Sequence, residues 1–188
     1  MYGSFLNFTT PQRLEKLVSR RRKIILLALV VPVGLIAGLA VVGSLRDTHV
    51  VTVTRSTTAD RDVIWELWAD VEHRPEWDKG LDYIKLDGPF EAGASGTVKV
   101  EGQDPIKYKV IEVAAKERFT DRFESLPGTH TDWQHTIETN EHGGYDVTWR
   151  LETRGPLSLI SLPVLESIFG EEVPAAVDEF VTLAEARS

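Results

Sequence analysis

Two side chains suited to acid–base chemistry, Asp121 and His135, fall within segments whose residues alternate as in β-strands. His135 shares its apolar face with Trp133, and Asp121 shares its face with Phe119 and Phe123. If the two strands pair, the carboxylate and the imidazole meet in the interior. A carboxylate that orients an imidazole raises its basicity, which makes a general base. The alternatives are an inward polar pair without chemistry, or a register that places Asp121 in solvent.

Other chemical signatures are missing from the sequence. The remaining histidines are scattered and lack metal-ligand spacing such as H-E-x-x-H. No G-x-S-x-G elbow, phosphate-binding loop or dinucleotide-binding glycine motif is present, and the chain has no cysteine. The sequence therefore predicts no metal and no cofactor, and it excludes disulfides, thiolate nucleophiles and Cys-ligated zinc.

The elements that position these residues form one α+β domain over 47–188. A first strand at 50–58 precedes a helix at 60–71, which Pro75 separates from a short helical turn at 76–77. Six further strands are predicted at 82–86, 96–101, 106–113, 118–124, 132–139 and 145–153. Their faces differ in polarity, which is typical of an antiparallel sheet covered on one side.

The cover is predicted to be a C-terminal helix that begins after Gly170 and carries Val173, Val177 and Phe180 at helical spacing. The apolar stretch 157–169 before it is broken by Pro163. That stretch is either the first half of the buried cover, which we favour, or a lid that leans on a lipid bilayer.

This order of elements resembles a known family. A tryptophan in a helix entered through Asp60, followed by D-x-x-x-x-P-x-W over 70–77, makes residues 48–187 similar to the START-like (SRPBCC) superfamily, which includes polyketide cyclase/dehydrases. The turn region 88–96 and the tail 169–183 are also similar to that group. The resemblance implies a helix-grip fold, in which a curved antiparallel sheet wraps around the long C-terminal helix. It also implies an elongated apolar cavity for lipids, sterols or aromatic polyketides, with cyclisation or dehydration catalysed by a minority of members.

The predicted cavity lies between the sheet and the last helix. Its expected wall consists of the inward residues of both: Tyr83, Tyr108, Phe119, Phe123, Trp133, His135, Tyr145, Trp149, Phe169, Val173, Val177 and Phe180. For the tyrosines and Trp149, plain core packing is an equal alternative. We interpret Trp65, Trp68 and Trp77 as residues that pack the helical hairpin onto the sheet.

A different kind of segment precedes the domain. Residues 24–45 form an apolar run without a charged side chain. Its 22 residues make roughly 33 Å of helix, enough to cross a hydrocarbon core. We therefore expect a transmembrane helix at 24–45 after a basic leader, residues 1–23. Gly34 and Gly38 have the G-x-x-x-G spacing that permits a homodimer.

The charges on either side of the apolar run predict how the chain is oriented in the membrane. Residues 1–46 hold seven Lys and Arg against one acidic residue, so the leader is expected in the cytoplasm and residues 47–188 outside it, as a single-pass protein of the cell membrane. Cleavage of the segment as a secretory signal is the alternative. Residues 47–188 carry 14 Lys and Arg against 28 Asp and Glu, a net charge of −14 that disfavours nucleic-acid binding.

The sequence is consistent with three functions. The favoured one is a membrane-anchored binding or carrier domain for a hydrophobic small molecule, a lipid or a polyketide-like compound. The second is a cyclase/dehydrase-type enzyme that uses the pair Asp121 and His135. The third is an interaction or stress-related module whose cavity is closed.

Overall fold

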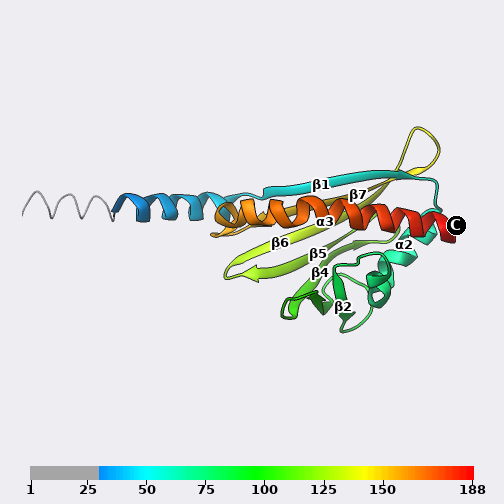
Figure 1. Cartoon of the computed structure of the whole chain (residues 1–188), viewed down its shortest axis with the longest axis horizontal. Coiled ribbons are helices and arrows are strands. Elements are labelled where there is room, and N and C mark those ends of the chain that lie inside the picture. Colours follow the sequence, from blue (N-terminus) through cyan, green and yellow to red (C-terminus); the bar gives the residue numbers. More distant parts are fainter. Residues whose placement is uncertain (1–29) are drawn as a thin grey trace, which may run out of the picture. The chain divides into compact units, whose positions relative to one another are not determined.

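The computed structural model describes residues 30–188 and divides the chain into two compact units, Met1–Leu39 and Ala40–Ser188 (Figure 1). The predicted leader, 1–23, and the first six residues of the predicted span, 24–29, lie outside the described residues. A helix covers 30–45. Within residues 30–188, no helix combines the length and the apolar character needed to cross a membrane.

Unit 2 contains one antiparallel sheet of seven strands, as the sequence predicts. Its spatial order is β1-β7-β6-β5-β4-β3-β2, so the first and last strands of the chain are neighbours. The strands are β1 (Thr48–Thr57), β2 (Leu81–Leu86), β3 (Ser95–Val100), β4 (Ile106–Ala114), β5 (Arg118–Leu126), β6 (Thr129–Thr139) and β7 (Tyr145–Arg154). Each strand begins and ends within three residues of its predicted bounds, because alternating polarity and turn residues define both.

The register of the central strands sets out the inner face of the sheet. On β5 and β6, Phe119 lies opposite His135 and Asp121 lies opposite Trp133. On the next pair, His135 lies opposite Trp149 of β7. The two strands that carry Asp121 and His135 therefore pair, which is the condition set for the Asp121–His135 hypothesis, and both side chains are buried.

Two short helical segments connect β1 to β2. The helix α2 (Arg61–Ala69) buries Ile64, Leu67 and Trp68, which recur at the spacing of one helical face. A 3-10 helix, η1 (Val71–Glu76), follows directly and includes Pro75. It buries Val71 and, unusually for a charged residue, Arg74.

The C-terminal helix is longer than predicted. It is one helix, α3 (Ser158–Arg187), with Pro163 and Pro174 inside it. A proline inside a helix costs about 3 kcal/mol, because it removes a hydrogen bond and crowds the preceding turn. The buried side chains of α3 offset this cost, since each large apolar side chain contributes roughly 1.5–3 kcal/mol on burial.

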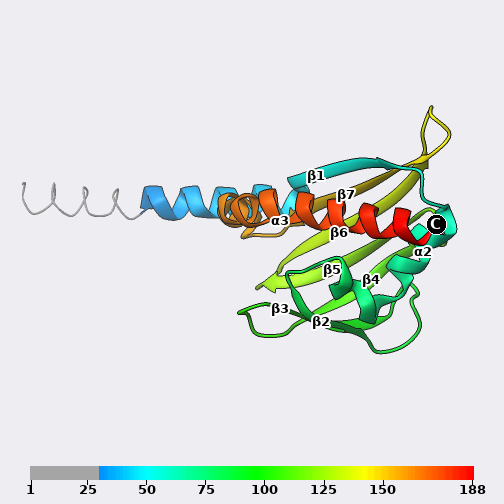
Figure 2. The ribbon, with the colours of Figure 1, turned by 45° about the vertical axis from the view of Figure 1, so that its right-hand side comes forward.

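The helix α3 lies along the strands while the sheet curves beside it (Figures 1 and 2). Aromatic rings fill the interface: Trp68 stacks on Phe180 with ring centroids 5.5 Å apart, and Trp149 packs against Trp77 at 5.2 Å. A seven-strand antiparallel sheet closed by a long C-terminal helix is the helix-grip architecture predicted from the sequence.

The stretch 157–169 is neither fully buried nor fully exposed. Leu162, Leu165 and Phe169 pack against the core. Ile160, Val164 and Ile168, each one helical turn from the next, are exposed by 47%, 60% and 39%. We call these three residues the exposed apolar stripe of α3. One face of the stretch covers the core, as the buried-cover expectation requires, and the other face is apolar and exposed to solvent, as the lid expectation requires.

Candidate functional site

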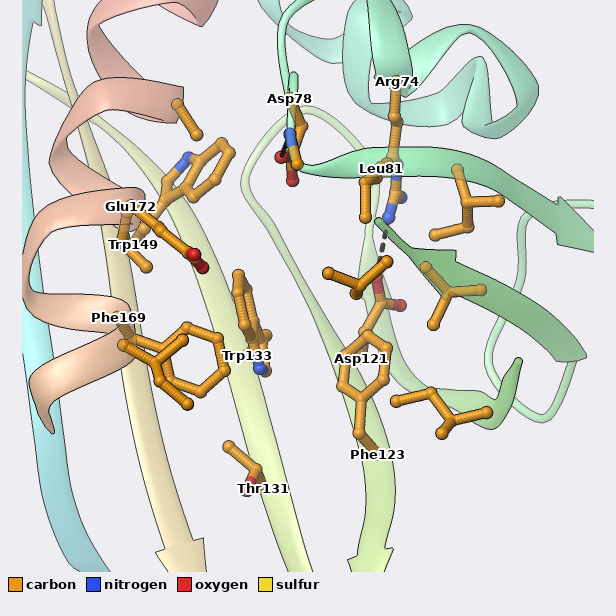
Figure 3. A pocket seen from close by; sticks show the side chains of 18 of the residues that line it. Arg74, Asp78, Leu81, Asp121, Phe123, Thr131, Trp133, Trp149, Phe169 and Glu172 are labelled. Atoms are coloured by element: carbon orange, nitrogen blue, oxygen red, sulfur yellow. Dashed lines mark hydrogen bonds and ion pairs between the residues drawn. The ribbon is translucent and has the colours of Figure 1, made fainter. Parts of the chain in front are cut away.

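A cavity of about 230 Å³ lies inside unit 2, between the sheet, α3 and the segment that joins η1 to β2 (Figure 3). The sheet contributes mainly apolar and aromatic side chains, among them Ile84, Val98, Ile106, Phe123, Trp133 and Trp149. The helix contributes Leu165, Ile168, Phe169, Glu172, Val173 and Ala176. The cavity arises because these large side chains do not fill the space where the curved sheet departs from the helix.

A buried ion pair forms one wall of the cavity. Nη1 of Arg74 donates a hydrogen bond to Oδ2 of Asp121 at 2.8 Å, and both side chains are at most 5% exposed. The backbone of α2 holds the arginine, because Nε and Nη2 of Arg74 both donate to the carbonyl oxygen of Trp68, at 3.2 and 2.9 Å. The guanidinium also lies over the ring of Phe119, 5.0 Å from its centroid.

Only one oxygen of Asp121 is used by this pair. Oδ1 of Asp121 is buried and has no hydrogen-bond partner among residues 30–188. Burial raises the pKa of Asp121, while the charge of Arg74 and its hydrogen bond oppose that rise. An unpartnered buried acceptor is costly, so this oxygen is available to a donor that enters the cavity.

The ring of His135 is fixed by its neighbours and is uncharged. Nδ1 lies 3.1 Å from the carbonyl oxygen of Trp133, which only accepts, so Nδ1 carries the proton and Nε2 keeps its lone pair. The ring stacks on Phe119 at 4.1 Å. Burial, assisted by the nearby positive charge of Arg74, lowers the pKa of His135 well below its ordinary value of 6.5.

The structure thus separates the two residues proposed as a catalytic pair. Both line the cavity, but Asp121 forms its hydrogen bond with Arg74, and His135 forms its hydrogen bond with the backbone of Trp133. The physical reason is that a guanidinium offers a stronger partner to a buried carboxylate than a neutral imidazole does.

Two more carboxyl groups face each other across the cavity. Asp78 projects from the loop after η1, and Glu172 projects from α3 on the opposite side (Figure 3). Burial raises the pKa of Asp78 to about 6, and the negative charge of Glu172 adds to the rise. Oδ1 of Asp78 accepts a hydrogen bond from the backbone N–H of Gly80 at 3.2 Å.

The predicted wall residues divide into two groups. Six line the cavity: Phe123, Trp133, His135, Trp149, Phe169 and Val173. Six lie elsewhere: Tyr83, Tyr108, Phe119, Tyr145, Val177 and Phe180. Of these, Phe119, Val177 and Phe180 belong to the main core, and Tyr108 belongs to a second core cluster, where it stacks on Phe123. Tyr145 lies under the guanidinium of Arg61, and Tyr83 lies under Lys85.

Sequence reasoning named Asp121 and His135 but missed the other polar side chains of the cavity wall: Arg74, Trp77, Asp78, Gln103, Thr131 and Glu172. Arg74 and Trp77 lie within the motif that carries the family resemblance, but their type and spacing do not indicate an inward direction. Glu172 precedes the buried residue Val173 on α3, and this was the only feature of the sequence that placed Glu172 near the interior. Among residues 30–188, no three His, Asp or Glu side chains converge as a metal site would require.

Comparison with solved structures places the fold among known proteins. An aromatase/cyclase (Zhui) of Streptomyces sp. R1128 matches with a TM-score of 0.62 at 16% identity, over 76% of this chain and 96% of that one. A START superfamily protein of Mycobacterium smegmatis matches with a TM-score of 0.59 at 14% identity, over 75% and 100%. Norcoclaurine synthase of Thalictrum flavum, in complex with dopamine and hydroxybenzaldehyde, matches with 0.60 at 13%, over 79% and 93%.

At these identities the likeness to solved structures shows the fold alone. A search of curated proteins returns no matching sequence. A family model described as polyketide cyclase/dehydrase and lipid transport matches residues 48–185, which is nearly the whole of unit 2 apart from residues 40–47. The chain therefore belongs to the polyketide cyclase/dehydrase and lipid transport family.

Proposed function

We propose that the chain is a membrane-anchored binding or carrier domain for a hydrophobic small molecule held between the sheet and α3. The observation that carries this proposal is the cavity itself, a space of about 230 Å³ lined mostly by aliphatic and aromatic side chains. Binding of an apolar ligand is favourable here, because it removes the apolar surface of the cavity and of the ligand from water. The family description, which includes lipid transport, is consistent with this use.

The enzyme hypothesis has less support from the geometry. Acid–base catalysis by Asp121 and His135 needs the carboxylate to orient the imidazole, whereas Asp121 is bonded to Arg74. The lowered pKa of His135 also makes it a weak base at neutral pH. A closed interaction module is disfavoured by the open space between sheet and helix.

Membrane attachment is the second part of the proposal, and the entry of the chain into unit 2 supports it. The carbonyl oxygen of Gly43 accepts the N–H of Gly155 at 2.9 Å, and Oγ of Ser158 lies 3.4 Å from the same oxygen. The apolar segment therefore enters the domain beside the first residues of α3. The exposed apolar stripe begins there, and its last member, Ile168, also lines the cavity. This stripe would rest on the bilayer, close to where a ligand enters.

The ligand proposal is tested on the full chain. The protein is extracted from membranes with a styrene–maleic acid copolymer and studied by native mass spectrometry, followed by extraction of small molecules. We compare it with Ala176→Phe, which fills the cavity, and with Ala175→Phe on the exposed side of the same turn of α3. Bilayer lipids bound outside the cavity would be equal in both variants.

A compound that co-purifies with the natural chain and with Ala175→Phe, but not with Ala176→Phe, would be the cavity ligand. A thermal unfolding scan checks that both variants are folded. If no compound distinguishes them, the carrier function is wrong.

The anchor is tested with single cysteines, which the cysteine-free chain makes simple. In sealed right-side-out vesicles, a membrane-impermeant maleimide should label Glu141→Cys at once and Ser4→Cys only after lysis. The mass of the mature chain decides between an anchor and a cleaved signal. Dimerisation through Gly34 and Gly38 remains a prediction, for which cross-linking before and after Gly38→Leu is the measurement.

A further inference from the structure

The charges in the cavity do not balance. Asp78, Asp121 and Glu172 line it, and Arg74 is the only Lys or Arg among the lining residues. The guanidinium is already bonded to Asp121 and to the backbone of Trp68. Asp78 and Glu172 form no ion pair among residues 30–188, so these carboxyl groups have no cation that belongs to the described chain. Asp78 is partly withdrawn from water, whereas Glu172 is exposed and lines the open side of the cavity, so a positive partner is favoured most strongly beside Asp78.

Three buried polar side-chain atoms of the cavity wall have no partner among residues 30–188: one acceptor, Oδ1 of Asp121, and two donors, the indole N–H groups of Trp77 and Trp149. Oδ1 of Asp121 is fully buried and receives no hydrogen bond from the described residues. Nε2 of His135 keeps a lone pair, because the proton of this ring is on Nδ1. These two atoms belong to β5 and β6, whereas Asp78 and Glu172 belong to the η1–β2 loop and α3. A hydrogen-bond donor on the ligand therefore suits the acceptors of Asp121 and His135, on the sheet side of the cavity.

The apolar wall is aromatic where it adjoins the carboxyl groups. Trp77 precedes Asp78 and packs against Trp149, and Trp133 packs edge-on against Phe169 with ring centroids 5.2 Å apart. In Figure 3, Glu172 extends from α3 between the side chains of Trp149 and Trp133. Aromatic faces attract cations, and ammonium groups are recognised by aromatic rings together with carboxylates.

We propose that the cavity selects a hydrophobic ligand with a basic amine, whose ammonium group lies between Asp78 and Glu172 while its apolar part contacts the aromatic wall. Fatty acids and other anionic amphiphiles are excluded by the same charges. The inference rests on the proposed carrier function and names its ligand class. The cavity is smaller than the roughly 300–1,000 Å³ that commonly holds a drug-sized ligand, which favours one or two rings or a short chain.

Three naphthalene probes of similar size test the charge preference: 1-naphthylmethylamine, 1-naphthylmethanol and 1-naphthoate. Their affinities are measured at pH 7.5 by calorimetry with the full chain in phosphatidylcholine nanodiscs, with empty nanodiscs subtracted. We expect the amine to bind at least tenfold more tightly than the acid and several-fold more tightly than the alcohol. Glu172→Gln and Asp78→Asn should each weaken amine binding several-fold and leave alcohol binding unchanged.

Glu171→Gln is the matched control, because Glu171 and Glu172 are adjacent and both exposed, but only Glu172 lines the cavity. It should leave all three affinities unchanged. If the alcohol binds as tightly as the amine, or if Glu172→Gln has no more effect than Glu171→Gln, the amine inference is wrong and the carrier function stands. If none of the probes binds and no compound co-purifies with the natural chain, both are wrong.

Discussion

Arg74 is a buried cation that the fold holds by three hydrogen bonds, two to a carbonyl oxygen and one to Asp121. Taking both charges of such a pair out of water costs several kcal/mol, and their attraction repays this only when the geometry is good. The pair therefore contributes to the position of η1 over β5 more clearly than to the free energy of unfolding. Its two members are 47 residues apart in sequence, so it fixes a contact that local structure does not.

The first prediction concerns this pair. Arg74→Met should reduce the free energy of unfolding by about 3–5 kcal/mol, because it leaves the carboxylate of Asp121 buried without a partner. The double variant Arg74→Met/Asp121→Leu should be destabilised less than Arg74→Met alone. Urea unfolding of the full chain in a mild detergent measures both, and additive losses would contradict this account.

The second prediction concerns Asp78, whose pKa rises from 3.8 to about 6 on folding. Between these two values the folded state binds more protons than the unfolded chain, so the stability contributed by this group decreases as pH rises from about 4 to about 6. Asp78→Asn removes the effect and keeps an acceptor for Gly80. The variant should therefore gain stability relative to the natural chain between pH 4 and pH 7, by at most about 3 kcal/mol.

Asp146 gives the opposite sign in the same experiment. Hydrogen bonds from Ser56 and Asn140 lower the pKa of Asp146 on folding. Its contribution to stability is present above the ordinary carboxyl range and is lost as pH falls through the folded value. Asp146→Asn should thus lose stability relative to the natural chain as pH rises toward about 4, and the difference should stay nearly constant from there to pH 7. Equal pH profiles for the two variants would contradict both assignments.

At the scale of elements, the strands were predictable and the polar site was not. A strand such as β7 alternates apolar and polar residues along its whole length, so its bounds and its inner face follow from a local pattern. The inward direction of Arg74 depends instead on a 3-10 helix that lies over a distant strand. The length of α3 was missed for a related reason, since prolines normally indicate a helix end and tertiary packing overrides that preference here.

Two glycines provide a prediction at this scale. A Cβ on Gly96 of β3 would overlap the backbone oxygen of Lys85 and the ring of Tyr108, so Gly96→Ala should destabilise the β2–β3–β4 part of the sheet by about 1–3 kcal/mol. A Cβ on Gly170 of α3 would meet no atom within 4 Å, so Gly170→Ala should stabilise the chain by about 0.5–1 kcal/mol. Thermal unfolding of the two variants should show shifts in opposite directions, and a loss in both would contradict the second expectation.

At the scale of the whole molecule, charge is distributed by segment. Residues 1–46 have a net charge of +6 and residues 47–188 have a net charge of −14, although the chain as a whole carries −8. An acidic domain is repelled by anionic lipid headgroups, so the proposed bilayer contact depends on its uncharged stripe on α3 rather than on general attraction. The same field attracts small cations toward unit 2, in agreement with the ligand class inferred for its cavity.

The two prolines of α3 have a consequence for the part of this helix that covers the cavity. Neither has an N–H, so the helical hydrogen bonds to the carbonyl oxygens of Leu159 and Gly170 are missing. Between these two residues lie Leu165, Ile168 and Phe169, three of the residues with which α3 covers the cavity. This part of α3 therefore lacks one backbone hydrogen bond at each of its two ends. Because these two hydrogen bonds are already missing, displacing this part of α3 costs fewer backbone hydrogen bonds than displacing an equal length of helix without proline.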